Sequence, residues 1–132
     1  PERPAPTPPA ATPGPAPAVP AAGFDELDRT TAYHLWQLRS LVFVVEQDCP
    51  YLDLDGRDLE PATVHLWVED EAGTPVATLR LLDDGDVARI GRVVTHPDAR
   101  GRALAGALLD EAVARIGELP VDVELGVHVR AE

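Results

Sequence analysis

A short basic turn, Arg100-Gly101-Arg102-Ala103, carries the clearest chemical signal in the sequence. It lies between a strand-like run, residues 90–95, and a helix-like run. The first N–H groups of a helix lack intrahelical partners, and the helix dipole adds partial positive charge beside them. Small residues let a phosphate approach the backbone, and the two arginines add charged donors. The spacing favours an anion site, although an ordinary strand-to-helix connection with solvated arginines fits it as well.

The charge balance of the chain supports an anionic ligand at this turn. The sequence carries 23 acidic residues and 11 basic ones, all of them arginine, which gives a net charge of −12. Such a balance opposes binding to nucleic acid or to an anionic membrane. Four arginines nevertheless lie within 14 residues: Arg89, Arg92, Arg100 and Arg102. This local reversal of sign favours an anionic ligand near the turn.

The elements that must position the turn predict an α+β domain over residues 24–132. A helix begins after Asp28 or Thr30, either of which can cap it, and runs to about Glu46. Its apolar residues predict a buried face of Tyr33, Trp36 or Gln37, Leu41, Val44 and Val45. Alternating residues predict strands at 64–69, 75–82 and 89–95.

A second helix, residues 103–117, follows the turn. Its 3.6-residue spacing predicts a buried face of Ala105, Leu109, Ala112, Val113 and Ile116. A last strand at residues 121–129 should lie parallel to residues 90–95, because strand–helix–strand units make right-handed crossovers. The predicted sheet is therefore mixed and mostly antiparallel, with flanking helices.

Residues 1–23 differ from the rest in composition. They hold nine of the 14 prolines and can bury almost nothing apolar, so they predict a disordered Pro/Ala-rich tail. The tail has no apolar segment of the kind a secretory signal needs, and no apolar run in the chain is long enough to span a membrane. The single cysteine, Cys49, fits a reducing compartment. We therefore expect a cytoplasmic protein.

The acidic run over residues 53–58, Asp-Leu-Asp-Gly-Arg-Asp, has a superficial likeness to a calcium loop. The EF-hand pattern requires glycine at its sixth position, whereas Gly56 stands fourth. A solvated acidic turn is the better interpretation, and no metal site is predicted.

The basic turn resembles the acetyl-CoA loop of the GNAT N-acetyltransferase superfamily. That loop reads Arg/Gln-x-x-Gly-x-Gly/Ala, and here Arg100 and Ala105 match while Ala103 replaces the central glycine. Further segments resemble the ElaA-like branch of the superfamily: residues 43–47, 49–51, 53–58, 65–67 and 90–93. The similarity runs from about Phe24 to Gly117, and residues 121–132 read unlike the branch.

The resemblance implies a GNAT-like acyl-CoA N-acyltransferase fold, acetyl-CoA as cosubstrate, and a small-molecule or peptide amine as acceptor. Members of the branch continue past the last matched strand with a helix and two strands, and that helix carries a tyrosine that serves as an acid. They also have a strand before the first helix, where this chain has its tail. We therefore expect a domain incomplete at the C-terminus, with impaired activity. The alternative is a non-catalytic acetyl-CoA-binding or degenerate domain, and a purely structural interaction module is a third reading.

The resemblance also implies roles for individual residues. Backbone groups of Val93, Val94 and Thr95 would pair with the pantetheine arm, and one N–H there would polarise the thioester carbonyl. The pyrophosphate would be held by N–H groups of Arg100, Gly101, Arg102, Ala103, Leu104 and Ala105. Glu46 and His65 are candidate catalytic bases, directly or through water. Their alternatives are a surface acid at a helix end and a strand histidine packed beside Trp67.

The predicted last strand would be a sheet edge with unpaired backbone groups. We therefore expect self-association through residues 121–129, or completion of the sheet by another polypeptide, although Asp122 and Glu124 work against such pairing.

Overall fold

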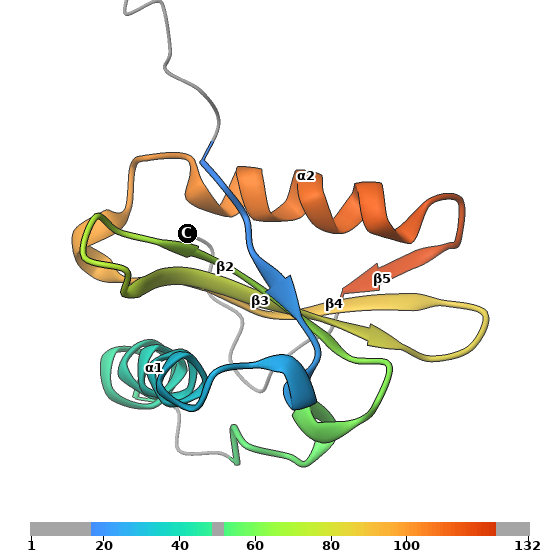
Figure 1. The fold of residues 1–132 in the computed structure, drawn as a ribbon, viewed down its shortest axis with the longest axis horizontal. Coiled ribbons are helices and arrows are strands. Elements are labelled where there is room, and N and C mark those ends of the chain that lie inside the picture. The colour runs from blue at the N-terminus through green and yellow to red at the C-terminus, as the bar shows by residue number, and fades with distance from the viewer. Residues whose placement is uncertain (1–16, 49–51, 124–132) are drawn as a thin grey trace, which may run out of the picture.

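The computed structural model of the chain describes residues 17–48 and 52–123. Its centre is one sheet of five strands in chain order (Figure 1). The first four strands are antiparallel neighbours, and the fifth joins the fourth in parallel. The strands are β1 (Ala21–Ala22), β2 (Val64–Glu69), β3 (Pro75–Asp83), β4 (Ala88–Thr95) and β5 (Val121–Val123). The predicted mixed, mostly antiparallel sheet is confirmed, and the predicted strand beyond Val123 lies outside the described residues.

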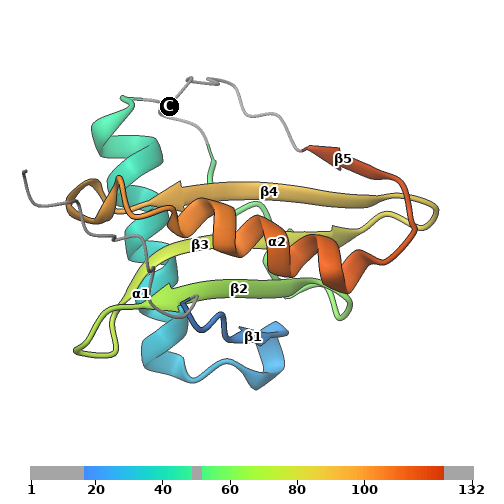
Figure 2. The same cartoon turned by 90° about the horizontal axis from the view of Figure 1, so that it is seen from above.

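Two helices cover opposite faces of this sheet. Figures 1 and 2 show α1 (Arg29–Arg39) on one face and α2 (Leu104–Ile116) on the other. Short 3₁₀ turns complete the described structure: η1 (Phe24–Glu26), η3 (Arg57–Leu59) and η4 (Pro97–Ala99). No helix among the described residues is long and apolar enough to cross a membrane.

Successive side chains of each strand point to opposite faces of the sheet, and each face packs against one of the two helices. Towards α2 the sheet presents aliphatic side chains that form the larger core with the buried stripe of the helix. That core includes Leu66, Leu79, Leu81, Ile90, Leu104, Leu108, Ala112 and Ile116. The core on the α1 side is small: Leu38, Val42, Val94 and the half-buried Phe43.

A short strand precedes the first helix, contrary to the sequence-based expectation. Ala21 and Ala22 pair with Leu66 and His65 of β2, and Trp67 donates its backbone N–H to Pro20. Two alanines carry too little pattern to signal a strand, and it forms because β2 offers an open edge to pair with. Residues 1–16 of the predicted tail lie outside the described residues.

The first helix buries a different face from the one predicted. Leu35, Leu38 and Val42 are buried, whereas Tyr33 is 67% exposed and Val45 69% exposed. The spacing of three and four between the buried residues fits an α-helix as well as the predicted set does. The helix then continues as a π-helix, η2 (Ser40–Glu46), which shifts the face that residues 44–46 present.

The face of α2 was predicted only in part. Ala112 and Ile116 are buried as expected, but Leu104 and Leu108 complete the stripe, and Val113 is 52% exposed. The first buried residue follows the turn directly, one position before the predicted Ala105.

All three aspartates of the acidic run are ion-paired, and two of them, Asp53 and Asp58, are buried, so the prediction of a solvated turn is wrong. Arg39 of α1 binds Asp53 through Nε at 3.0 Å and Asp58 through Nη1 at 2.8 Å. Arg80 of β3 binds Asp58 at 3.1 Å and Asp55 at 2.8 Å. Arg92 of β4 binds Asp53 at 2.7 Å and Asp55 at 3.3 Å. We call these six residues the Arg–Asp network.

The network lowers the pKa of two of its carboxylates, Asp55 and Asp58. Burial would raise the pKa of Asp58, but the hydrogen bond and charge of Arg39, with help from Arg80, outweigh it and lower the pKa below its usual value of 3.8. A hydrogen bond from Arg80 holds the pKa of Asp55 well below its usual range, against the effect of burial. The run therefore fastens a loop to the sheet instead of lying in solvent.

Asp58→Asn should lower the free energy of unfolding by roughly 3–5 kcal/mol at pH 7, because it takes from the buried Arg39 and Arg80 the carboxylate that they share. Since the pKa of Asp58 is lowered in the folded chain, its stabilisation is present above pH 3.8 and is lost as the pH falls through the folded value. Urea unfolding at pH 7 and pH 3 should show that the difference in unfolding free energy between the wild type and Asp58→Asn is smaller at pH 3. Asp84→Asn is the control, since the exposed Asp84 also bridges two arginines. Equal losses in the two variants would contradict the prediction.

Candidate functional site

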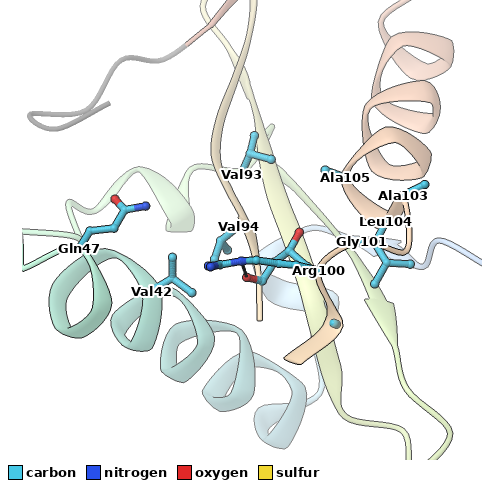
Figure 3. Close-up of a pocket in the computed structure, with 11 residues that line it drawn as sticks. Val42, Gln47, Val93, Val94, Arg100, Gly101, Ala103, Leu104 and Ala105 are labelled. Atoms are coloured by element: carbon cyan, nitrogen blue, oxygen red, sulfur yellow. Dashed lines mark hydrogen bonds between the residues drawn. The ribbon is translucent and has the colours of Figure 1, made fainter. Parts of the chain in front are cut away.

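A pocket of about 420 Å³ opens where three elements meet: the end of η2, the second half of β4, and the turn that begins α2 (Figure 3). Its lining is mostly apolar and small-chained, with a few polar groups. The lining residues are Val42, Gln47, Val93, Val94, Thr95, Ala99, Arg100, Gly101, Ala103, Leu104 and Ala105. Eight of the nine predicted cofactor-binding residues therefore come together, and Arg102 is the exception.

The turn before α2 has the geometry of an uncapped helix start. Gly101 has φ +87° and Ala103 has φ +60°, so two left-handed residues reverse the chain between η4 and α2. Ala103 is the N-cap residue, and its side chain offers no hydrogen-bond acceptor to the first turn. The N–H groups that open α2 consequently have neither an intrahelical partner nor a side-chain cap, and they border the pocket.

Arg100 connects the walls of the pocket. Its Nε donates to the carbonyl of Thr95 at 3.1 Å, and its two Nη atoms donate to the carboxylate of Glu46 at 2.7 and 2.9 Å. Figure 3 shows the arginine side chain extended from the turn towards the helix that carries Val42 and Gln47. Glu46, a candidate base in the sequence analysis, thus forms a bidentate ion pair with Arg100 at the edge of the pocket.

The four clustered arginines do not make a cationic patch. Arg89 pairs with Asp84 and Asp122, and Arg92 with the acids of the Arg–Asp network. Arg102 lies beside Asp70 and Glu71 in a separate hollow at the β2–β3 hairpin. Acids from distant segments largely neutralise the positive charge of the arginine cluster. Of the four arginines, only Arg100 therefore still indicates an anionic ligand.

His65, the other predicted base, lies away from the pocket. It is 1% exposed, its Nε2 is 3.2 Å from the carbonyl oxygen of Asp58, and its ring meets the Trp36 ring edge-on at 5.3 Å. Burial lowers its pKa, which keeps the ring neutral near pH 7. The structure therefore supports the alternative, a packed strand histidine, although its aromatic neighbour is Trp36 of α1.

A β-bulge divides β4 next to the pocket. Arg80 pairs with Gly91 and Thr78 pairs with Val94, so two residues of β4, Arg92 and Val93, stand opposite one residue of β3. Arg92 has φ +52°, a left-handed conformation for a non-glycine residue. The described part of β5 pairs with the half of β4 before the bulge, and the half after the bulge lines the pocket.

The residues that sequence reasoning missed are Val42, Gln47 and Ala99, which complete the lining. Gln47 belongs to residues 43–47, one of the segments that resemble the ElaA-like branch, and this resemblance could have indicated it as a pocket residue. Together the lining offers the N–H groups that open α2 and the guanidinium of Arg100, with the apolar side chains of Val93 and Val94 from β4 beside them. Such a site suits a phosphate group joined to a narrow chain.

Residues 29–131 match the acetyltransferase (GNAT) family, and the chain belongs to it. This match extends to residue 131, so the prediction that residues 121–132 read unlike the family is wrong. Local strand patterning is too short there to reveal the similarity by inspection.

Individual relatives agree with this assignment. The chain is 44% identical over 110 residues to a UPF0039 protein of Mycobacterium tuberculosis, covering 80% of this chain and 70% of that one. It is 39% identical over 90 residues to protein ElaA of Escherichia coli, covering 67% and 59%. An acyl-CoA N-acyltransferase from Pseudomonas aeruginosa has the same fold, with a TM-score of 0.74, 38% identity and coverage of 80% and 77%. The GNAT acyl-CoA N-acyltransferase fold and the likeness to ElaA are confirmed.

Glu46→Gln should tighten binding of CoA by roughly two- to fivefold, because it removes a carboxylate that competes with phosphate for Arg100. Calorimetric titration measures this directly. Glu118→Gln, a similar charge removal at the far end of α2, is the control. If Glu46 acted instead as a base, the glutamine variant would bind CoA as the wild type does and would lose only turnover.

Ala103→Gly should raise the free energy of unfolding by roughly 0.5–1 kcal/mol, since glycine adopts φ +60° without the left-handed penalty of alanine. If the methyl group also crowds a bound pyrophosphate, CoA should bind more tightly. Ala105→Gly, two residues further into α2, should be destabilising by up to ~1 kcal/mol and serves as the matched control. Urea unfolding of the wild type, Ala103→Gly and Ala105→Gly tests this prediction. A loss of stability in Ala103→Gly would contradict the backbone strain assigned to Ala103.

Proposed function

We propose that the chain is an N-acetyltransferase that moves an acetyl group from acetyl-CoA to an amine of a small molecule or peptide. One observation carries the proposal: the uncapped start of α2 and the half of β4 after its bulge border the same pocket, in a member of the GNAT family. Acetyl-CoA supplies an activated thioester, and the residues of the chain bind and orient it.

The N-terminal end of α2 would hold the pyrophosphate. Donors from residues 100–105 and the helix dipole favour negative charge there, and the guanidinium of Arg100 adds a bidentate partner. Glu46 has to release Arg100, at least in part, when phosphate arrives. The small side chains of Gly101 and Ala103 allow the close approach that such backbone contacts require.

The second half of β4 would align the pantetheine arm beside residues 93–95. An N–H group there would donate to the thioester oxygen, where negative charge grows as the amine attacks. Holding both reactants in one pocket supplies a further large part of the rate.

The proton of the attacking amine has no evident acceptor in the lining. None of the described residues in the lining is a histidine or a carboxylate: Glu46 stands outside the lining as the ion-pair partner of Arg100, and His65 is buried elsewhere. We infer that the amine loses its proton to water, so turnover should rise with pH along the titration of the acceptor amine itself.

Calorimetry with acetyl-CoA, followed by a thiol-release assay on a panel of primary amines, tests the proposal. Arg100→Ala should weaken acetyl-CoA binding by roughly 1–3 kcal/mol. Arg115→Ala, which breaks an exposed pair with Glu111 at the other end of α2, should change it little. Binding without thiol release would favour the non-catalytic acetyl-CoA-binding alternative, and no binding at all would sink both.

A further inference from the structure

The bulge in β4 is held in a conformation that its own sequence disfavours. Arg92 has φ +52°, and left-handed backbone is unfavourable for a residue with a side chain. Glycine is the usual residue at such a position, and Gly91 stands immediately before it. An arginine therefore needs a compensating interaction to keep the bulge formed.

The side chain of Arg92 supplies that interaction. Its Nε lies 2.7 Å from Oδ1 of Asp53, and its Nη2 donates to the carbonyl of Asp53 at 3.0 Å and to Asp55 at 3.3 Å. The Arg92 side chain is 8% exposed, so water screens these contacts little. The contact between Nε and Oδ1 is short but not aligned as a hydrogen bond, so it is an ionic contact. The hydrogen bond from Nη2 to the carbonyl of Asp53 therefore fixes the orientation of the guanidinium.

The partner of Arg92 is itself immobilised. Arg39 of α1 holds the carboxylate of Asp53 at 3.0 Å and its carbonyl at 3.1 Å, and Arg80 of β3 holds Asp55 with both Nη atoms. Arg92 is thus tied to a segment that a helix and a neighbouring strand already fix. We call the contact between Asp53 and Arg92 the bulge latch.

The bulge decides which way the lining of the pocket points. Ala88 and Ile90, before the bulge, pack in the core under α2. Strict alternation would place Val94 in that same core, but it packs with Leu38 and Val42 on the α1 side, while Val93 contacts the α2 core. A one-residue slip reverses every side chain that follows it. The orientation of residues 93–95 therefore depends on the bulge.

We propose that Arg92 is a positioning residue: the latch to Asp53 holds the β4 bulge and thereby aims residues 93–95 at the cofactor and its thioester carbonyl. This rests on the proposed function for the meaning of the carbonyl contact, but the latch itself concerns the chain alone. Arg92 does not line the pocket and acts through its neighbours.

Two variants at one position separate the role of Arg92 in holding the bulge from its role as a charge. Arg92→Met and Arg92→Gly both remove the guanidinium, but only glycine accepts the left-handed backbone without strain. Arg89→Met is the control, because Arg89 also lies on β4 and pairs with acids but stands before the bulge. Two readouts apply: the ¹³Cα shift of residue 92 without ligand, with the ¹³Cβ shift wherever the residue is not glycine, and the ¹³C shift of the carbonyl in acetyl-CoA labelled at that carbon.

The proposal expects left-handed shifts at residue 92 in the wild type, the Arg92→Gly variant and the Arg89→Met variant, and extended shifts in Arg92→Met. Bound acetyl-CoA should show the full downfield carbonyl shift in wild type and Arg89→Met, a partial one in Arg92→Gly, and none in Arg92→Met. Affinity should fall about tenfold in Arg92→Met and less in Arg92→Gly. A glycine variant that folds where the methionine variant does not also supports the latch.

Other outcomes overturn it. Left-handed shifts in Arg92→Met, or a carbonyl shift there equal to that of the wild type, would mean that the bulge stands without the latch. A glycine variant as damaged as the methionine variant would mean that Arg92 matters only as a charge. If wild-type chain binds no acetyl-CoA, the proposed function fails, and the shifts of residue 92 still decide the latch.

Discussion

The Arg–Asp network is the interaction on which the arrangement of this domain depends. Three arginines from α1, β3 and β4 meet three aspartates of one loop, and the charges balance. Burying so many charges is costly, and pairing them roughly recovers that cost without a large net gain in stability. The consequence is geometric: the ion pairs hold α1, β3, β4 and the loop in one relative position, whereas the aliphatic core under α2 could tolerate small shifts.

Strain in the backbone is concentrated around the pocket. The non-glycine residues with positive φ in the described part of the chain are Asp48, Arg92 and Ala103. Asp48 follows Gln47 in sequence, Arg92 precedes Val93, and Ala103 lies in the lining itself. Such conformations persist only where surrounding contacts determine them, and they gather at sites that bind ligands. Ion pairs hold Arg92 in this conformation, and Ala103 adopts it at the start of α2. The backbone around the pocket therefore has its shape before any ligand binds.

The sequence predicted the fold and most of the pocket, and the reasons are local. The strand, turn and helix around residues 90–117 have strong patterns, and the basic turn that lines the pocket is contiguous in sequence. What failed depended on distant partners. The acidic run at 53–58 was taken for a solvated turn because nothing near it in sequence reveals the three arginines that pair with its aspartates. The faces of both helices were misassigned where two sets of apolar residues fit the same period, and only packing against the sheet chooses between them. Glu46 and His65 were candidate bases with structural alternatives, and residue type carries no information on burial or pairing, so their catalytic roles stay predictions.

The electrostatics of the pocket follow from the same pairing. In a chain of net charge −12, an arginine without a carboxylate partner would be the exception, and Arg100 does have one in Glu46. Both side chains are about a third exposed, so their contact is weak enough to exchange. The network arginines are buried with their acids, which leaves them no comparable freedom. The buried pairs therefore hold the structure together. At the pocket the solvent-accessible pair can exchange, so Arg100 can turn to another anion whose oxygens also accept from the N–H groups that open α2.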